Sequence, residues 1–328
     1  MSKHRVLVTT VPFGDSNNYP LELMESNDIS YDINPLGRKL TADELSEMVV
    51  DYSIIIAGTE SINKLVMDNA TRLKLISRVG IGLDSVDLLY ARKKGIQVSY
   101  TPDAPAPAVS ELTIGLMLSL IRSIHISNTG MHKGDWNRYF GHRISNLVVG
   151  IIGTGRIGRR VVHHLLGFGC KRVLVNDLNE DNLFSDLYNV EYVSKEDIYK
   201  NSDILSIHIP LTLDTFNLIT KKEISLMKSG VILINTSRGG IINENDLADA
   251  LLDEKVSSAA IDAFEKEPYF GRLASLDNCI LTAHMGSMTV DCRSLMEIQA
   301  TEEIVRFVKG ENLIGGVPDS EYIVQGKE

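Results

Sequence analysis

Three polar residues stand in a fixed order in the second half of the chain: Arg238, Glu267 and His284. An arginine can grip a carboxylate with its planar set of donors and polarise a developing carbonyl group. A histidine titrates near neutral pH and can take the proton of a hydroxyl group. A glutamate can hold the other ring nitrogen and stabilise the imidazolium. Taken singly, Arg238 could be an ordinary backbone contact, Glu267 an exposed charge and His284 a loop histidine. As a set, the three residues suit proton transfer beside a substrate carboxylate, which requires neither a nucleophile nor a metal.

A glycine-rich segment precedes this set, Gly153-Thr-Gly155-Arg-Ile-Gly158. The first glycine permits a tight turn, the second lets the backbone approach a pyrophosphate, and the third allows close helix–strand packing. Asp177 lies 177 − 158 = 19 residues further on, near the spacing of about 20 for a carboxylate that binds ribose hydroxyls. Because a carboxylate repels a 2′-phosphate and no Lys or Arg follows before Lys195, the segment predicts NAD rather than NADP. The alternative is a glycine turn beside a solvent-facing aspartate.

The two features together indicate hydride transfer between NAD and a carbon that bears a hydroxyl beside a carboxylate. Each residue of the polar set follows a predicted strand, and ligands of open α/β sheets bind outside the carboxyl ends of the strands. We therefore expect Arg238, Glu267 and His284 to lie on one rim. The strands concerned are expected at Val231–Asn235, Ser258–Asp262 and Ile280–Thr282.

Short β-branched runs alternate with amphipathic stretches on both sides of residue 102, which predicts an α/β fold with parallel sheets covered on both faces. In the first block Thr41 and Glu44 form a capping box for a helix from Ala42 to Val50. Pro102, Pro105 and Pro107 then mark a crossing between domains, because no helix interior tolerates them, and a long apolar helix is expected from 109 to 128. Other predicted strands are Val6–Thr10, Ile54–Ala57, Leu75–Ser77, Ile96–Tyr100, Leu147–Ile152, Arg172–Val175 and Ile204–Ile209.

The expected class is two doubly wound parallel-sheet domains. Residues 102–289 form a central Rossmann domain for NAD, and residues 1–101 with 290–328 form a discontinuous, flavodoxin-like substrate domain. The last helix, from Asp291 to Lys309, is expected to return to the first domain and to end at Gly310.

The composition describes an ordinary globular protein: 328 residues, 44% of them hydrophobic, with a net charge of −10. This charge argues against nucleic acid or an anionic membrane as the main partner. The cysteines at 170, 279 and 292 lack metal or redox spacing, which fits a reducing compartment. The apolar stretch 112–126 is too short and too polar to span a bilayer, and the N-terminus resembles a strand rather than a signal peptide. We expect a cytoplasmic protein.

Four segments of the chain carry a resemblance to a known family. They are Ile234-Asn-Thr-Ser-Arg238-Gly-Gly240, Asp262-Ala-Phe-Glu-Lys-Glu267-Pro268, Thr282-Ala-His284-Met-Gly286 and Arg78-Val-Gly80-Ile-Gly82-Leu-Asp84-Ser-Val-Asp87. These segments resemble those of the NAD-dependent D-isomer-specific 2-hydroxyacid dehydrogenases. The resemblance covers nearly the whole chain, and it implies dimerisation through the NAD domain, giving a homodimer, and catalytic roles for Arg238, Glu267 and His284.

The same resemblance implies further contacts. The backbone amides of Val79, Gly80 and Ile81 would hold the substrate carboxylate, and a plain strand-to-helix turn is the equal alternative. Arg78 would meet a substrate phosphate or form an outward salt bridge. The implied cofactor contacts, besides the three glycines, Arg238 and His284, are Arg156, Ile157, Asp177, His208, Pro210, Thr215, Thr236, Ser237, Asp262 and Gly286.

Among family members, 3-phosphoglycerate dehydrogenases look closest through residues 78–87, but the chain departs from the common pattern. Thr101-Pro-Asp-Ala-Pro105 lacks the asparagine found after Thr-Pro in many members, and Ala283 replaces the proline that usually precedes the histidine. The identity of the 2-hydroxy acid therefore stays open. One rival is an NAD(H)-sensing regulator of the corepressor type, which keeps the same polar set but usually carries a disordered tail. The other is a formate- or phosphite-type enzyme, against which Glu267 argues because formate enzymes pair the histidine with glutamine.

Overall fold

The computed structural model describes residues 4–326, and backbone contacts divide the chain into two compact units. Unit 1 runs up to Pro105 and resumes at Met288, and unit 2 is Ala106–Ser287. The sequence had suggested crossings after residue 101 and before residue 290. Within the described residues no single helix is long and apolar enough to cross a membrane, although a bent helix pair passes by length and composition.

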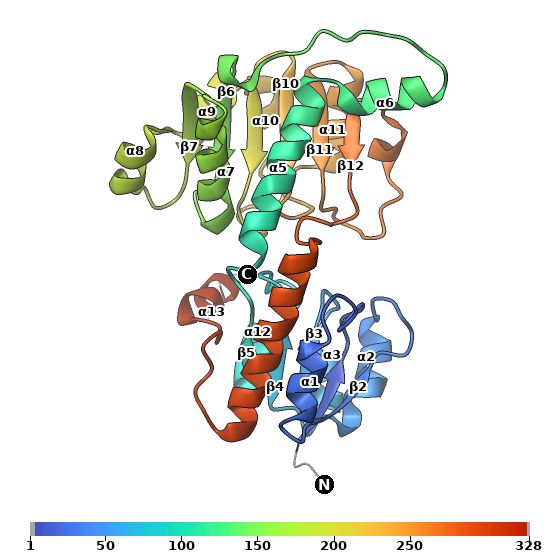
Figure 1. Ribbon diagram of the computed structural model, residues 1–328. Coiled ribbons are helices and arrows are strands. Elements are labelled where there is room, and N and C mark those ends of the chain that lie inside the picture. The colour runs from blue at the N-terminus through green and yellow to red at the C-terminus, as the bar shows by residue number, and fades with distance from the viewer. Residues whose placement is uncertain (1–3, 327–328) are drawn as a thin grey trace. The chain divides into compact units, whose positions relative to one another are not determined.

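Unit 1 contains a five-stranded parallel sheet with the order β2-β1-β3-β4-β5 (Figure 1). This is the flavodoxin-like order of doubly wound sheets. The central strands β3 and β4 are buried at every residue, as expected for a sheet covered on both faces. The strands are β1 (Arg5–Val8), β2 (Ser30–Ile33), β3 (Ile54–Ala57), β4 (Leu75–Arg78) and β5 (Gln97–Ser99).

Helices cover both faces of this sheet. Leu7, Ile55 and Ile76 pack in one buried cluster with residues of α2, α3 and α4. On β4 the neighbouring residue Ser77 instead donates to the carbonyl of Ala300 in α12, at 2.8 Å. The predicted capping box of α2 is confirmed. The helices are α1 (Tyr19–Glu25), α2 (Ala42–Met48), the 3-10 turn η1 (Val49–Asp51), α3 (Lys64–Asn69), α4 (Leu88–Lys93), α12 (Val290–Lys309) and α13 (Asp319–Gln325).

Unit 2 contains a seven-stranded parallel sheet with the order β12-β11-β10-β9-β6-β7-β8. The chain winds outward from β6 in both directions, so the strand order reverses between β6 and β9, where doubly wound folds bind nucleotides. The α/β class with two parallel-sheet units is thus confirmed. The strands are β6 (Val148–Ile152), β7 (Arg172–Asn176), β8 (Glu191–Tyr192), β9 (Ile204–Ile207), β10 (Val231–Asn235), β11 (Val256–Ile261) and β12 (Cys279–Leu281).

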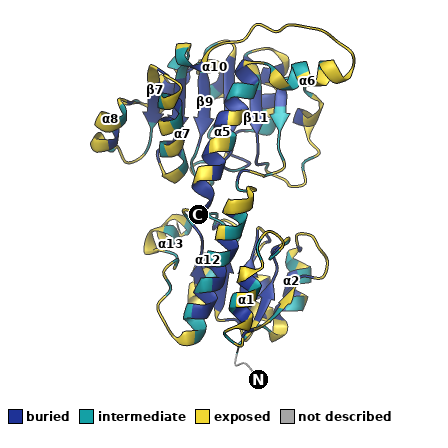
Figure 2. Cartoon of the chain, in the orientation of Figure 1, coloured by how far each residue is buried: buried dark blue, intermediate teal, exposed yellow. Residues whose placement is uncertain are grey.

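The central strands of unit 2 are buried on both faces (Figure 2). One face packs against α5 and α7, and the other packs against α9, α10 and α11. The helices are α5 (Pro105–Ile121), α6 (Ile124–His132), η2 (Ile144–Asn146), α7 (Arg156–Gly167), α8 (Asn182–Tyr188), α9 (Lys195–Asn201), α10 (Lys221–Leu226), α11 (Glu244–Leu252) and η3 (Arg272–Ser275).

Two expectations about the long apolar helix were wrong. It begins at Pro105 rather than after the prolines, because a proline in the first turn removes only amides that lack intrahelical partners. It also breaks at Ser123, whose backbone is left-handed with φ 50°. The chain therefore continues as a second helix, α6, at a bend of 67°.

Candidate active site

The glycine loop connects β6 to α7 and needs its glycines for steric reasons. Gly153 has φ +95°, and a Cβ there would lie 2.4 Å from the carbonyl oxygen of His208. A Cβ on Gly158 would lie 1.9 Å from the carbonyl oxygen of Gly153. At the helix start, Gly155 is the N-cap and supplies no side-chain hydrogen bond. The N-terminal amides of α7 therefore face the loop, as a phosphate-binding helix terminus requires.

Asp177 follows directly after β7 and closes onto this loop. Its Oδ2 accepts from the amide of Thr154 at 2.7 Å and from the hydroxyl of Thr154 at 3.1 Å. Its Oδ1 accepts from the amide of Asn179 at 3.0 Å. A carboxylate oxygen can accept more than one donor, so these bonds leave capacity for ribose hydroxyls. Asp177 thus has a structural task in the loop beside the predicted ribose contact.

The loop after β9 carries a buried polar atom that fits a ligand. Nε2 of His208 bonds the hydroxyl of Ser206 at 2.9 Å, whereas its buried Nδ1 has no partner. Burial lowers the pKa of His208 to about 3, so this ring is neutral at physiological pH. Further along the loop the hydroxyl of Thr215 donates to the carbonyl of Pro210 at 2.7 Å. The loop is thus held by its own hydrogen bonds, and Nδ1 of His208 is a buried polar atom that a bound ligand could satisfy.

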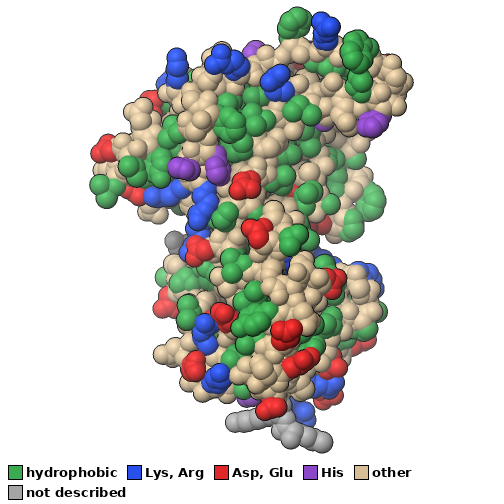
Figure 3. All heavy atoms as spheres, in the orientation of Figure 1, with side chains coloured by type: hydrophobic (Ala, Val, Ile, Leu, Met, Phe, Trp, Pro, Cys, Tyr) green, Lys and Arg blue, Asp and Glu red, His purple; other side chains and the backbone are tan. Residues whose placement is uncertain are grey.

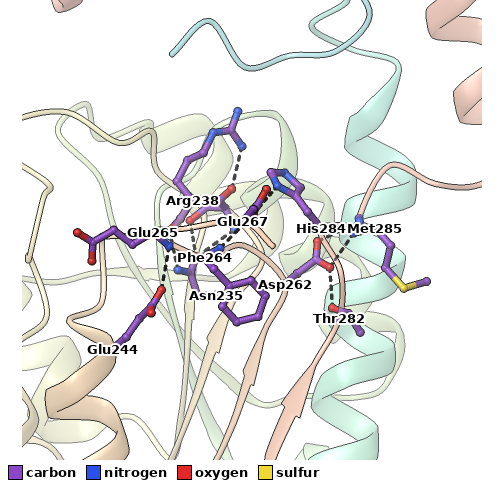
Figure 4. Close-up of polar contacts among 12 residues, drawn as sticks. Asn235, Arg238, Glu244, Asp262, Phe264, Glu265, Glu267, Thr282, His284 and Met285 are labelled. Atoms are coloured by element: carbon purple, nitrogen blue, oxygen red, sulfur yellow. Dashed lines mark hydrogen bonds and ion pairs between the residues drawn. The ribbon is translucent and has the colours of Figure 1, made fainter. Parts of the chain in front are cut away.

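Glu267 and His284 meet through a hydrogen bond of 2.9 Å between Oε1 and Nδ1 (Figure 4). The same Oε1 accepts from the amide of Phe264 at 3.2 Å. The His284 side chain is 36% exposed, so the ring is held at one nitrogen and is still reachable. Glu267 and His284 follow the neighbouring strands β11 and β12. The strand-end placement predicted from the sequence brings these two side chains into contact.

The backbone of His284 is left-handed, with φ 49°, a conformation that is uncommon for residues other than glycine. The buried carboxylate of Asp262 organises the loop around it. Asp262 accepts from the hydroxyl of Thr282 at 2.6 Å and from the amides of Met285 and Gly286, each at 2.9 Å. The amide of His284 donates to the carbonyl of Asp262 at 2.8 Å. Asp262, predicted only as a cofactor contact, is the anchor of the histidine loop.

Arg238 lies on the loop after β10, next to the loop that carries Glu267 (Figure 4). One of its guanidinium nitrogens donates to the carbonyl of Ser237 at 2.8 Å. The side chain of Asn235 shapes this loop: it donates to the carbonyl of Arg238 at 2.7 Å and accepts from the amide of Ser237 at 3.0 Å. Neighbouring Thr236 bonds Thr113 at 2.8 Å.

Sequence reasoning missed two residues that support the site, Asn235 and Thr282. A usable signal was present, because each polar residue closes an otherwise apolar strand run: Val-Ile-Leu-Ile before Asn235, and Cys-Ile-Leu before Thr282. A buried polar side chain needs hydrogen-bond partners, and here it finds them in the functional loops.

In unit 1 the predicted substrate loop is bonded within its own unit. The amide of Val79 donates to the carbonyl of Ala57 at 2.9 Å, and the amide of Gly80 donates to the hydroxyl of Thr101 at 2.8 Å. Two of the three amides expected to hold a carboxylate thus already have acceptors. Within the described part of the chain, only the amide of Ile81 has no acceptor. Of the three amides, it alone could bind a substrate carboxylate without first breaking a hydrogen bond.

Arg78 is not the outward-facing side chain considered from the sequence. It is 4% exposed, and its Nε and one terminal nitrogen donate to the carbonyl of Gly82 at 3.0 and 2.7 Å. The other terminal nitrogen lies 3.5 Å from the carbonyl of Ala57. The guanidinium shapes the loop that it begins, because a buried cation needs such acceptors.

Comparisons with known proteins show which family this chain belongs to. Residues 114–286 match the family described as D-isomer specific 2-hydroxyacid dehydrogenase, NAD binding domain. A hydroxypyruvate reductase from Thermotoga maritima is 35% identical over 81% of this chain and 88% of its own length. The chain belongs to the D-isomer specific 2-hydroxyacid dehydrogenases. It is accordingly an NAD-dependent oxidoreductase that acts on the CH–OH group of a 2-hydroxy acid.

Other members of this dehydrogenase family differ in substrate. A D-3-phosphoglycerate dehydrogenase from Methanocaldococcus jannaschii is 35% identical over 83% of this chain, but the match spans only 53% of that relative. The structure of D-lactate dehydrogenase from Aquifex aeolicus, complexed with NAD and lactic acid, is 26% identical with a TM-score of 0.85, covering 96% of this chain and 100% of that one. The family therefore fixes the cofactor and the reaction type, while the substrate varies among its members.

Proposed function

We propose that this dehydrogenase interconverts a small 2-oxo acid and its D-2-hydroxy acid, with His284 as the acid–base group. The bond between His284 and Glu267 carries the proposal. A carboxylate that accepts at Nδ1 holds the proton on that nitrogen and leaves the Nε2 lone pair to act as a base. In the oxidation direction Nε2 takes the hydroxyl proton, and Glu267 stabilises the resulting imidazolium.

When bound, NAD supplies the acceptor for the hydride of the same carbon. The residues of the chain do the rest. Arg238 grips the substrate carboxylate and polarises the carbonyl oxygen with its charged donors. We assign the phosphate contacts to the amides of Arg156 and Ile157 at the start of α7, and the ribose contact to Asp177. His208 contributes its unpaired Nδ1, and Thr236, Ser237 and Gly286 border the same loops.

A panel of 2-oxo acids tests the function directly. Purified protein with NADH is mixed with glyoxylate, hydroxypyruvate, pyruvate or 3-phosphohydroxypyruvate, and the loss of NADH absorbance is followed. We expect turnover with at least one acid and clearly weaker turnover with NADPH. Binding of NADH without turnover on any acid would contradict the proposal and would favour an NAD(H)-sensing role.

We also propose that the protein is a cytoplasmic homodimer formed through unit 2. The segment from α6 to residue 143, here called the arm, supports this because α6 contains no buried residue. Trp136 and Phe140 are 78% and 104% exposed, and hydrophobic side chains stand out on this part of unit 2 (Figure 3). Exposed apolar patches of this kind mark association surfaces. Light scattering should give the mass of a dimer, and a Trp136→Ala, Phe140→Ala variant should shift it toward a monomer.

A further inference from the structure

A buried carboxylate stands at the carboxyl end of β3 in unit 1. Glu60 is 2% exposed and accepts from the amide of Gly58 at 2.8 Å and from the hydroxyl of Thr9, which follows β1. A Cβ on Gly58 would lie 2.9 Å from Oε2 of Glu60 and 2.9 Å from the hydroxyl of Thr10. Gly58 thus leaves room for the Glu60 carboxylate, which packs closely against the residues that follow β1.

Glu60 lacks the cation that a buried carboxylate usually has. Within residues 4–326 it forms no ion pair, whereas the nearby Glu297 pairs with Arg293 at 2.6 Å, with side-chain exposures of 2% and 12%. Arg293 also donates to Thr10 at 3.0 Å and to the carbonyl of Pro12. These two carboxylates and one guanidinium leave one net negative charge. Because burying an unpaired charge is costly, the retention of Glu60 calls for a purpose beyond packing.

The other cation at these strand ends is already bonded. Arg78 directs its donors at the carbonyls of Gly82 and Ala57, so gripping a phosphate would require breaking bonds to backbone oxygens. Arginine binds phosphate through two parallel hydrogen bonds, and here three of its nitrogens point at carbonyl groups. Unit 1 therefore offers a buried negative charge at its strand ends and a cation that is already bonded to its own loop.

We infer that Glu60 is a specificity-determining residue that excludes 2-oxo acids with a second anionic group. The inference rests on the proposed function, and on the rule that open α/β sheets bind ligands outside the carboxyl ends of their strands. A phosphate or second carboxylate on the substrate meets the like charge of Glu60 at low dielectric. A neutral hydroxyl group, by contrast, meets no such charge repulsion. The preferred acid is thus unsubstituted or hydroxylated, as glyoxylate and hydroxypyruvate are, and not phosphorylated.

The wild-type protein provides the first test, because hydroxypyruvate and 3-phosphohydroxypyruvate differ only by the phosphate. We expect kcat/KM with NADH to favour hydroxypyruvate by roughly tenfold or more. A preference for the phosphorylated acid overturns the inference while leaving the proposed function intact. Failure on every 2-oxo acid overturns both, so the two failures are distinguishable. This test does not depend on the folding of any variant.

The Glu60→Gln variant provides the second test. It removes the charge and keeps an oxygen acceptor for Gly58 and Thr9. The ratio of kcat/KM between the two acids should move toward the phosphorylated one by about tenfold. Glu47→Gln is the matched control, because Glu47 is an exposed acid on α2 of the same unit, and its ratio should stay at the wild-type value. A purely structural role of Glu60 would lower both kcat/KM values alike, and an unchanged ratio in a folded Glu60→Gln variant overturns the inference.

Discussion

The two parallel sheets use the polar residues at their strand ends in opposite ways. In unit 2 the loops after β11 and β12 hold His284 by one nitrogen and leave its side chain 36% exposed. In unit 1 the charged residues at the carboxyl ends of β3 and β4 are buried: Glu60 is 2% and Arg78 4% exposed. One sheet presents its reactive groups, and the other buries its charges. This difference is the basis for our proposals that His284 of unit 2 is the acid–base group and that Glu60 of unit 1 disfavours acids with a second anionic group.

The largest effect is expected from His284→Ala. Loss of the acid–base group should lower kcat by a factor of roughly a thousand, whereas binding of NADH, followed by its fluorescence, should persist. The exposed His163 of α7 gives a matched control, and its alanine variant should keep its rate. An unchanged kcat, or loss of NADH binding, would contradict the role assigned to His284.

A smaller effect is expected from Asp177→Asn. The amide keeps an acceptor for Thr154 but removes the charge that repels a 2′-phosphate, so the preference for NAD over NADP should fall by about tenfold. Steady-state kcat/KM values with the two cofactors measure this. Asp186→Asn, at an exposed position in α8, serves as the control. The Glu60→Gln variant of unit 1 should also leave the NAD-to-NADP preference unchanged. A change in that preference would contradict the assignment of cofactor selection to unit 2.

Glu267→Gln should slow the oxidation direction. The imidazolium that forms when His284 takes the hydroxyl proton loses the negative charge that stabilises it, so kcat should fall by roughly tenfold. Glu265→Gln removes an exposed charge two residues away and should leave kcat unchanged. If kcat of both variants equals that of the wild type, Glu267 is not the working partner of His284.

The smallest effect at neutral pH is expected from His208→Gln. Burial lowers the pKa of His208 to about 3, against about 6.5 in an unfolded chain. The stability that this neutral ring contributes is present above pH 6.5 and is lost as the pH falls toward 3. Urea unfolding should therefore show that the wild type loses about 2 kcal/mol more than the variant between pH 7 and pH 5. Parallel losses would mean that the ring is solvated.

The sequence predicted the architecture well where strands are buried on both sides, because such strands are apolar along their whole length. It missed β2 and β8, each of which lies at one edge of its sheet. Ser30–Ile33 in β2 is largely exposed, and β8 has only two residues, Glu191 and Tyr192. Neither segment carries an apolar pattern from which a strand could be recognised.

The contact between Glu267 and His284 was predictable because both residues lie on loops that follow neighbouring parallel strands. The sequence could not show where a predicted binding group is already hydrogen-bonded to a residue that is distant in the sequence. The amide of Val79 is bonded to Ala57, and that of Gly80 to Thr101. Likewise, nothing in the spacing reveals that Asp262 collects three donors from the loop 282–286. Such bonds depend on how segments meet after folding.

The left-handed turn at His284 has a consequence for the timing of catalysis. A backbone in that region costs on the order of 1–3 kcal/mol, and the donors gathered on Asp262 meet this cost while the chain folds. The imidazole therefore stands in its working orientation before any acid arrives, and each turnover is spared that reorganisation. An asparagine, which tolerates the same backbone region, would keep the turn and remove the base, separating loop shape from proton transfer.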